Sequence, residues 1–81
     1  VNDNLIDLTK REFDLLQYLL ENKNIVMDRG TLLERVWGYS FSGGTNAVDV
    51  YIRYLRAKIE EPFRLKLIHT VRGVGYVIKD E

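Results

Sequence analysis

The chain has 81 residues, of which 46% are hydrophobic, twelve are Lys or Arg, twelve are Asp or Glu, and none is cysteine. This length suits one small domain with a packed core, and the missing cysteine excludes disulfides and thiolate metal sites. No apolar run reaches membrane-spanning length and no signal peptide is visible, which predicts a cytoplasmic protein without membrane contact. The chain starts at Val1 in the middle of its sequence pattern, so we expect it to be a fragment of a longer protein.

The charges are unevenly distributed although they sum to zero. Residues 1–44 hold five basic and seven acidic side chains, whereas residues 45–81 hold seven basic and five acidic ones. The zero net charge argues against a nonspecific polycation, but binding to phosphates depends on the local field. We therefore look for a nucleic-acid reader in the second half of the chain.

The first 24 residues predict a strand followed by a helix. Leu5–Leu8 fits a short strand, and Thr9 then caps a helix, with Glu12 three positions later completing a capping box. The polar residues 22–24 end this helix. Its apolar stripe, which we expect to be buried, comprises Phe13, Leu16, Leu19 and Leu20.

A second helix and a loop follow. Residues 25–27 are extended, and Asp28 is a good N-cap for a helix over residues 29–37 that stops at Gly38. The side chains expected to face inward are Leu32, Leu33, Val36 and Trp37. The loop over residues 39–44 carries two rings, Tyr39 and Phe41, which either pack back on the domain or mark a partner site.

The third helix, Thr45–Ile59, has two distinct faces. At 100° per residue a narrow apolar stripe must be buried, comprising Val48, Ile52, Leu55 and Ile59. The opposite face carries Asn46, Val50, Arg53, Tyr54 and Ala57. Arg can bond guanine, Asn can bond adenine, and small apolar groups can touch a thymine methyl. The alternative is an ordinary solvated face, but two tyrosines and a valine on or beside it are unusual there.

The last segment predicts a hairpin. Pro62 breaks the chain before a hairpin over residues 67–78, whose tight turn is permitted by Gly73 and Gly75. Arg72 is expected at the tip, where a guanidinium either borders a minor groove, reading its shape, or anchors a phosphate. Helix, helix, loop, helix and hairpin is the order of a winged helix-turn-helix, whose reader helix enters a major groove.

Four segments together resemble the DNA-binding effector domains of OmpR/PhoB-type response regulators. They are Leu8-Thr9-x-x-Glu12-x-x-Leu15-Leu16, Leu33-x-x-Val36-Trp37-Gly38, Val48-Asp49-Val50-Tyr51-Ile52-Arg53-Tyr54-Leu55-Arg56-x-Lys58-Ile59 and Thr70-Val71-Arg72-Gly73-Val74-Gly75-Tyr76. The resemblance implies an α+β winged helix-turn-helix with three helices, a C-terminal β-hairpin wing and a truncated N-terminal sheet. Of that sheet only Leu5–Leu8 and the end of the preceding strand, Val1, remain.

The same resemblance implies a function and partners. Residues 1–81 would be the effector domain of a bacterial two-component response regulator that controls transcription, with its receiver domain absent here. The implied partners are double-stranded DNA with direct-repeat half-sites, the receiver domain, a sensor kinase, and RNA polymerase through the loop 38–44. No cofactor is implied.

The site residues implied by the resemblance fall into three groups. Candidates for groove contacts are Asn46, Val50, Tyr51, Arg53 and Tyr54; candidates for backbone contacts are Arg56, Lys58, Thr70 and Tyr76. Arg72 would enter or border the minor groove. Arg29 and Trp37 could meet phosphates, although a Trp at a stripe position is usually core. Asp49 is expected to pair with Arg53 or Arg56, because i,i+4 spacing brings carboxylate and guanidinium together.

Two other functional classes compete with DNA binding. An enzyme would need converging catalytic groups, but His69 is the only histidine and the carboxylates are scattered. Gly73-Val74-Gly75 lacks the strand-to-helix context of a phosphate loop. A winged helix used for protein binding shares the fold but needs no guanidinium array, and salt dependence would distinguish it from a DNA reader.

Overall fold

A computed structural model describes residues 7–38 and 43–79 and contains three helical segments and a small sheet. Half of the strand expected at Leu5–Leu8 lies outside the described residues, and residues 7 and 8 are not in a strand. The loop rings Tyr39 and Phe41 also lie outside them. Among the described residues no helix has the length and apolar content needed to cross a bilayer.

Helix α1 (Lys10–Glu21) begins at the predicted capping box. The Glu12 backbone N–H donates to Thr9 Oγ1 at 3.2 Å, and the Thr9 N–H donates to Glu12 Oε1 at 2.9 Å. These reciprocal bonds satisfy two donors that a helix start otherwise leaves unpaired. The helix ends at Asn22, as predicted from the polar residues that follow.

The buried face of α1 differs from the predicted stripe. Leu15 and Leu19 are buried and Leu16 packs against the core, but Phe13 is 51% exposed and Leu20 is 50% exposed. The prediction was wrong for these two because apolar residues occur on more than half of the helix circumference. Periodicity alone cannot then choose the face, and contact with α3 decides it.

Helix α2 (Arg29–Leu32) continues without a break into the wider turn η1 (Leu33–Trp37). Asp28 caps it as predicted, with its Oδ2 accepting from the Thr31 N–H at 3.0 Å. Gly38 ends it with φ of +100°, a conformation that favours glycine. The inward face is confirmed, with Leu32 and Val36 buried and the other two predicted residues packed on the core.

Helix α3 (Asn46–Leu55) and the wider turn η2 (Arg56–Glu60) form the third helical segment. The predicted stripe is confirmed, because Val48, Ile52, Leu55 and Ile59 are all buried in the core. Glu60 ends the segment and is buried too. Its Oε2 accepts from the backbone N–H groups of Leu67 and Ile68 at 2.9 and 2.7 Å, which fixes the chain leading from α3 into the hairpin.

The sheet has three antiparallel strands in the order β1-β3-β2. The hairpin is confirmed as β2 (Ile68–Val71) and β3 (Gly75–Ile78), but β3 also pairs with β1 (Met27–Asp28), which precedes α2. Gly73 has φ of +77° and serves the turn as predicted. Gly75 instead allows β1 to approach β3 closely, since a Cβ there would lie 2.0 Å from the Met27 carbonyl oxygen.

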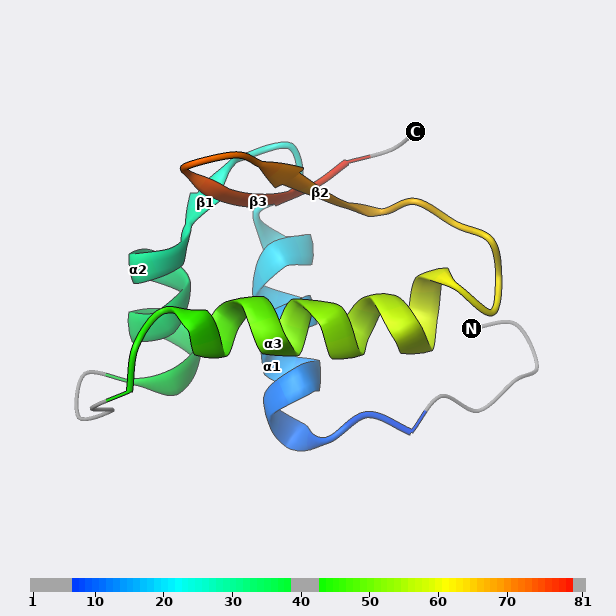
Figure 1. Ribbon diagram of the computed structural model, residues 1–81, viewed down its shortest axis with the longest axis horizontal. Coiled ribbons are helices and arrows are strands. Elements are labelled where there is room, and N and C mark those ends of the chain that lie inside the picture. Colours follow the sequence, from blue (N-terminus) through cyan, green and yellow to red (C-terminus); the bar gives the residue numbers. More distant parts are fainter. Residues whose placement is uncertain (1–6, 39–42, 80–81) are drawn as a thin grey trace.

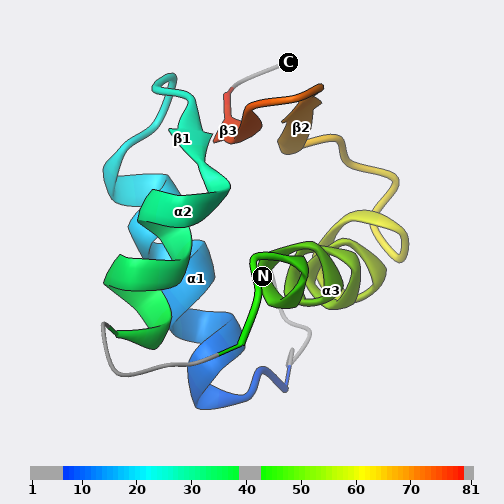
Figure 2. The same ribbon diagram turned by 60° about the vertical axis from the view of Figure 1, so that its left-hand side comes forward.

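The helices and the sheet enclose one core. In Figure 1, α3 crosses in front of α1, and the hairpin lies above it. The rotated view in Figure 2 looks nearly along α3, with α1 and α2 on one side of it and the sheet above. The remaining side of α3 is therefore left uncovered by these elements, with the hairpin at its edge.

A partly buried ion pair joins α1 to the third helical segment. Glu12 is 3% exposed and its Oε1 accepts from Lys58 Nζ at 2.7 Å. Burial raises the pKa of Glu12, but the hydrogen bonds from Lys58 and Thr9 and the charge of Lys58 outweigh it and lower the pKa. A lowered folded-state pKa means that the pair stabilises the fold at neutral pH and loses its effect as the carboxylate is protonated in acid.

We expect Glu12→Ala to destabilise the domain by about 2–3 kcal/mol, since it removes a helix cap and a charged hydrogen bond. Asp14→Ala is the matched control, because it removes a partly exposed α1 carboxylate that pairs with the exposed Lys10 at 3.2 Å. That change should cost under about 1 kcal/mol. Urea unfolding of both variants measures the difference, and equal losses would contradict the role given to Glu12.

Candidate nucleic-acid interface

The uncovered face of α3 carries the predicted reader residues. Asn46, Arg53 and Tyr54 are exposed and Val50 is half-buried, as expected for side chains opposite the buried stripe. The helix is held from behind by its apolar side, so these side chains need no rearrangement to meet a groove. Their amide, guanidinium and phenol groups offer the donors and acceptors that base edges and phosphates bind.

Tyr51 lies at the edge of this face and is less exposed than its neighbours. Its ring packs edge-on against Trp37, with centroids 5.2 Å apart, and against Tyr54 at 5.4 Å. The Arg11 guanidinium lies 5.5 Å from the Trp37 ring centroid. Trp37 thus packs at the rim of the core, as its stripe position indicated, and it joins the end of η1 to α3.

The wing turn belongs to a hairpin that is hydrogen-bonded to the third helical segment. Thr70 and Arg72 are exposed, and Arg72 begins the turn that connects β2 to β3. Arg56 is half-buried, and its Nη2 donates to the Ile68 carbonyl at 2.9 Å and to Thr70 Oγ1 at 2.8 Å. The guanidinium of Arg56 therefore already binds the wing, and its Nε lies 3.8 Å from Glu60 Oε1.

Asp49 does not pair as predicted. Its Oδ1 accepts from Arg29 Nε at 2.7 Å and from the hydroxyl of Tyr76, whereas Arg53 acts on it only through its charge. Local i,i+4 spacing gave the wrong partner because Arg29, twenty positions earlier, reaches Asp49 across the fold. Burial raises the pKa of Asp49, but the hydrogen bonds from Tyr76 and Arg29 and the charge of Arg29 outweigh it and lower the pKa.

Tyr76 is 5% exposed and belongs to the core. Its ring lies between two guanidinium groups, 5.7 Å from that of Arg29 and 5.8 Å from that of Arg56. Burial and the hydrogen bond to Asp49 raise the pKa of Tyr76, so its hydroxyl stays protonated and donates. Contact between this hydroxyl and DNA would require Tyr76 to leave Asp49.

Lys58 is separated from the other predicted site residues. Its Nζ donates to Glu12 and to the Asp7 carbonyl at 2.9 Å, on the side of the segment that faces α1. The structure thus joins two of the predicted site residues, Arg56 and Thr70, by a hydrogen bond. It leaves Asn46, Arg53 and Tyr54 of α3 and Arg72 of the wing exposed. Lys58 and Tyr76 lie outside this exposed set, with their polar atoms bonded inside the domain.

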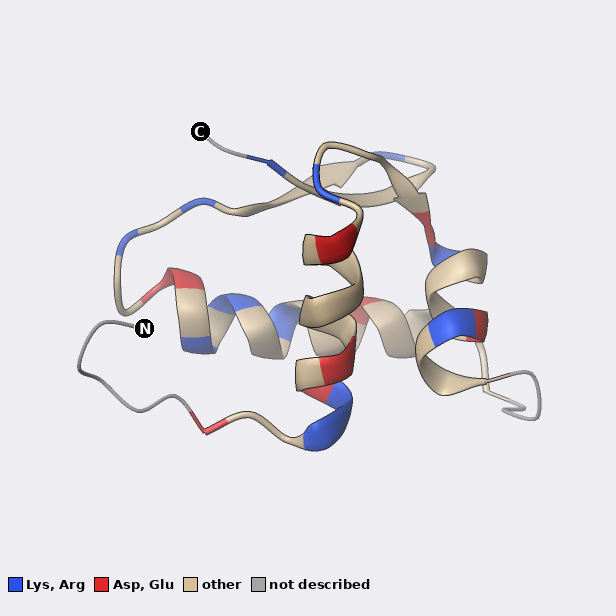
Figure 3. Ribbon diagram, turned by 180° about the vertical axis from the view of Figure 1, so that it is seen from behind, with Lys and Arg blue, Asp and Glu red and all other residues tan. Residues whose placement is uncertain are grey.

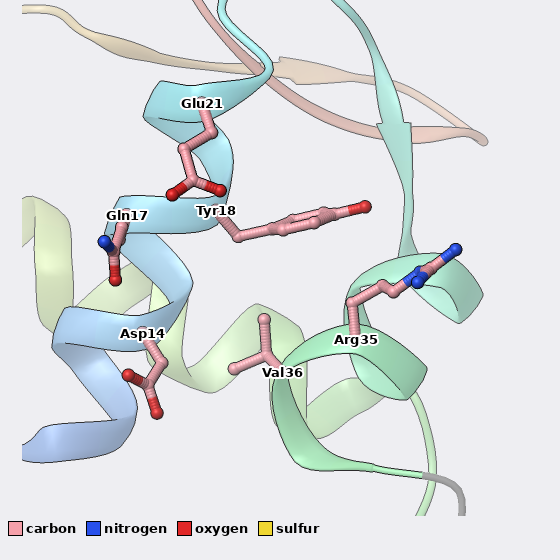
Figure 4. Close-up of a pocket in the computed structure, with 6 residues that line it drawn as sticks. All are labelled: Asp14, Gln17, Tyr18, Glu21, Arg35 and Val36. Carbon is pink, nitrogen blue, oxygen red and sulfur yellow. The ribbon is translucent and has the colours of Figure 1, made fainter.

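Charge and surface shape distinguish the two sides of the molecule. Seen from behind, blue segments recur along the third helical segment and the chain leading to β2, interrupted by red ones, while α1 is red beyond its blue first turn (Figure 3). A hollow of about 200 Å³ lies between α1 and η1, lined by Asp14, Gln17, Tyr18, Glu21, Arg35 and Val36. Figure 4 shows the Tyr18 ring extending across it toward η1. Its two carboxylates make it unsuited to phosphate, and it contains no predicted site residue.

Sequence reasoning missed the polar contacts that cross between elements. These are Asp49 with Arg29 and Tyr76, Arg56 with β2, Glu60 with the chain entering β2, and Arg11 with η1. The described residues contain no cluster of three His, Cys, Asp or Glu side chains placed for a metal ion.

Comparison with known proteins agrees with this arrangement. Residues 3–78 match the family described as "Transcriptional regulatory protein, C terminal". Response regulator ArlR of Staphylococcus aureus (strain Mu50 / ATCC 700699) is 60% identical over 79 residues, which are 98% of this chain and 36% of ArlR. The chain thus spans about a third of the length of the curated relatives it matches.

Solved structures share the fold closely. The DNA-binding domain of Bacillus subtilis CssR superposes with a TM-score of 0.84 at 36% identity, covering 95% of this chain and 83% of that one. The Klebsiella pneumoniae RstA DNA-binding domain, solved in complex with the RstA box, gives 0.77 at 33% identity, covering 91% and 74%. The chain therefore belongs to the family of C-terminal domains of transcriptional regulatory proteins, with the winged-helix fold of OmpR/PhoB-type DNA-binding domains.

Proposed function

We propose that the chain binds double-stranded DNA sequence-specifically, as the output domain of a bacterial two-component response regulator that controls transcription. One observation carries the proposal: α3 presents an exposed face with Asn46, Arg53 and Tyr54, and the hairpin with its exposed turn at Arg72 is fastened to the same helical segment. Hydrogen bonds of Asp49 with Tyr76 and of Arg56 with Thr70 hold the hairpin there. A helix in a major groove and a hairpin on the neighbouring backbone or minor groove use these two surfaces together. The RstA domain bound to its box is a relative with the same fold.

The residues divide by exposure into readers and supports. We assign groove contacts to Asn46, Val50, Arg53 and Tyr54, with Tyr51 at the edge, and backbone contacts to Thr70 and Arg56. Arg72 borders the minor groove. Lys58 and Tyr76 would act from inside the domain, because their polar atoms are bonded to Glu12, Asp7 and Asp49.

The proposed partners follow from the same family membership. Two copies would occupy direct-repeat half-sites about 10–11 bp apart, one helical turn. A receiver domain and a sensor kinase would act on the whole protein, RNA polymerase would contact the loop 38–44, and the setting would be cytoplasmic. No cofactor is required, because the proposed work is binding.

Arg53→Ala tests the reader assignment. Selection from a random duplex pool first defines the preferred site, and the same footprints show whether half-sites are tandem. We then expect Arg53→Ala to weaken binding to that site by about 1–3 kcal/mol, ten- to more than a hundredfold, and to relax preference at one position. Fluorescence anisotropy at fixed salt measures the change.

Arg35→Ala is the matched control, since it removes the same charge from the hollow between α1 and η1. It should leave affinity within about twofold, because Arg35 lies far from the reader face. An Arg53→Ala protein with unchanged affinity and base preference would remove Arg53 as a reader. Wild-type affinity that does not fall with added salt would favour the protein-binding alternative.

A further inference from the structure

A polar cluster joins α3 to both strands of the wing beneath the proposed DNA-binding surface. Asp49, in the first turn of α3, accepts from Tyr76 of β3 and from Arg29 at the start of α2. Arg56, seven positions along, donates to Thr70 of β2. Each strand of the hairpin therefore has its own hydrogen bond to the third helical segment.

The two attachments lie at one rung of the hairpin. Thr70 and Tyr76 are directly paired across β2 and β3, while Asp49 and Arg56 are separated by roughly 10 Å along the helix axis at 1.5 Å per residue. Two bonds from separated points on a helix to one rung fix both the distance and the angle between hairpin and helix. Arg72 follows Thr70 by two residues, so its position depends on that rung.

We propose that Asp49, held by Arg29 and Tyr76, is a positioning residue that sets the wing turn relative to α3, so that Arg72 and the reader face meet one duplex together. This inference rests on the proposed DNA binding. The carboxylate is well suited to the task because one oxygen accepts from two elements at once, and Arg29 balances its charge. No member of the cluster has to touch DNA for the positioning to matter.

Tyr76→Phe isolates the attachment. It removes the hydroxyl bonded to Asp49 but keeps the ring, its place in the core and its contacts with Arg29 and Arg56. The Asp49–Arg29 pair also survives, so the carboxylate is not left without a partner. Thermal unfolding should confirm that the variant is folded, and its remaining effect then reports where the wing lies.

A double-mutant cycle with Arg72→Ala measures the role in binding. We expect Tyr76→Phe to weaken binding to the selected duplex about five- to tenfold in the wild-type background and less than about twofold in the Arg72→Ala background. Once the wing arginine is absent, its misplacement has no further consequence. Equal losses in the two backgrounds would overturn the proposal, and so would no loss in either.

A second cycle with Asn46→Ala supplies the control. Asn46 lies on α3, which remains packed on the core in the Tyr76→Phe variant. The two substitutions should therefore act independently, so that the affinity of the double variant matches the product of the two single losses within about twofold. Strong coupling to Asn46 as well would mean that the hydroxyl supports the whole interface, which would overturn a role specific to the wing.

A measurement without DNA separates this inference from the proposed function. The chain has no cysteine, so spin labels at Arg72→Cys and Ala57→Cys attach only there, and electron–electron resonance gives the distance between wing and helix. We expect Tyr76→Phe to broaden that distance distribution and Tyr18→Phe, on the other side, to leave it unchanged. An unbroadened distribution overturns the positioning role, whereas a broadened one without any sequence-specific binding overturns only the function.

Discussion

Gly75→Ala is expected to destabilise the domain by at least about 3 kcal/mol. A Cβ at this position would lie 2.0 Å from the Met27 carbonyl oxygen and 2.8 Å from the Asp28 Cα. Both atoms belong to backbone in β1, which pairs with β3 at this point, so no flexible side chain can move aside. The substitution must push β1 away from β3 and with it the start of α2.

Gly73→Ala in the same hairpin is the matched control. Nothing lies within 4 Å of a Cβ at Gly73, and its only obstacle is φ of +77°, which should cost about 1–2 kcal/mol. Urea unfolding followed by circular dichroism gives both values. If the two variants lose equal stability, the close approach of β1 to β3 is not what requires glycine at position 75.

The contrast between these glycines shows what the sequence could and could not predict. A turn that needs a left-handed residue has a local signal, and Gly73 fulfils it. The requirement at Gly75 comes from β1, nearly fifty residues earlier, and a two-residue strand is too short for any periodic pattern. Residues 25–27 were therefore predicted to be extended but were not assigned to the hairpin, and the pairing of β1 with β3 appears only in the folded chain.

The helices were more predictable because their ends are chemically marked. The capping box at Thr9, the cap at Asp28 and the stop at Gly38 are all confirmed. The buried face of a helix was predictable only where polar residues flank the apolar stripe on both sides. That holds for α3, whereas α1 has apolar residues around much of its surface, and Phe13 was placed inside although it is half-exposed.

The candidate site was predictable as a surface but not as a set of bonds. Arg53 and Asn46 lie on the helix face opposite the buried apolar stripe, so the sequence alone predicts that they are exposed. Whether a polar side chain on the flanks is available or already bonded depends on distant elements, as with Lys58 and Glu12 or Tyr76 and Asp49. Long-range polar pairs carry no spacing rule, so nothing in the sequence separated Lys58 and Tyr76 from the other backbone contacts that the family resemblance implied.

Leu55→Ala is expected to cost about 3–5 kcal/mol of stability, through lost apolar transfer and the cavity left behind. Leu55 is fully buried at the centre of the stripe that seats α3. Tyr54→Ala, the adjacent position, removes a larger side chain that is 46% exposed and should cost under about 1 kcal/mol. Denaturant unfolding of the two variants measures the difference in the free energy of unfolding between a core position and an adjacent surface position of the same helix.

The same pair should reverse its order when DNA binding is measured in sucrose. Leu55→Ala weakens apparent binding only by unfolding the domain, so an excluded osmolyte such as sucrose, which favours burial, should restore it. Tyr54→Ala stays folded and loses a proposed groove contact, so sucrose should not restore its affinity. If Leu55→Ala remains weak once circular dichroism shows it folded, then the seating of α3, and not the fraction folded, limits recognition. If sucrose restores Tyr54→Ala, its loss was one of stability, and Tyr54 is not a reader.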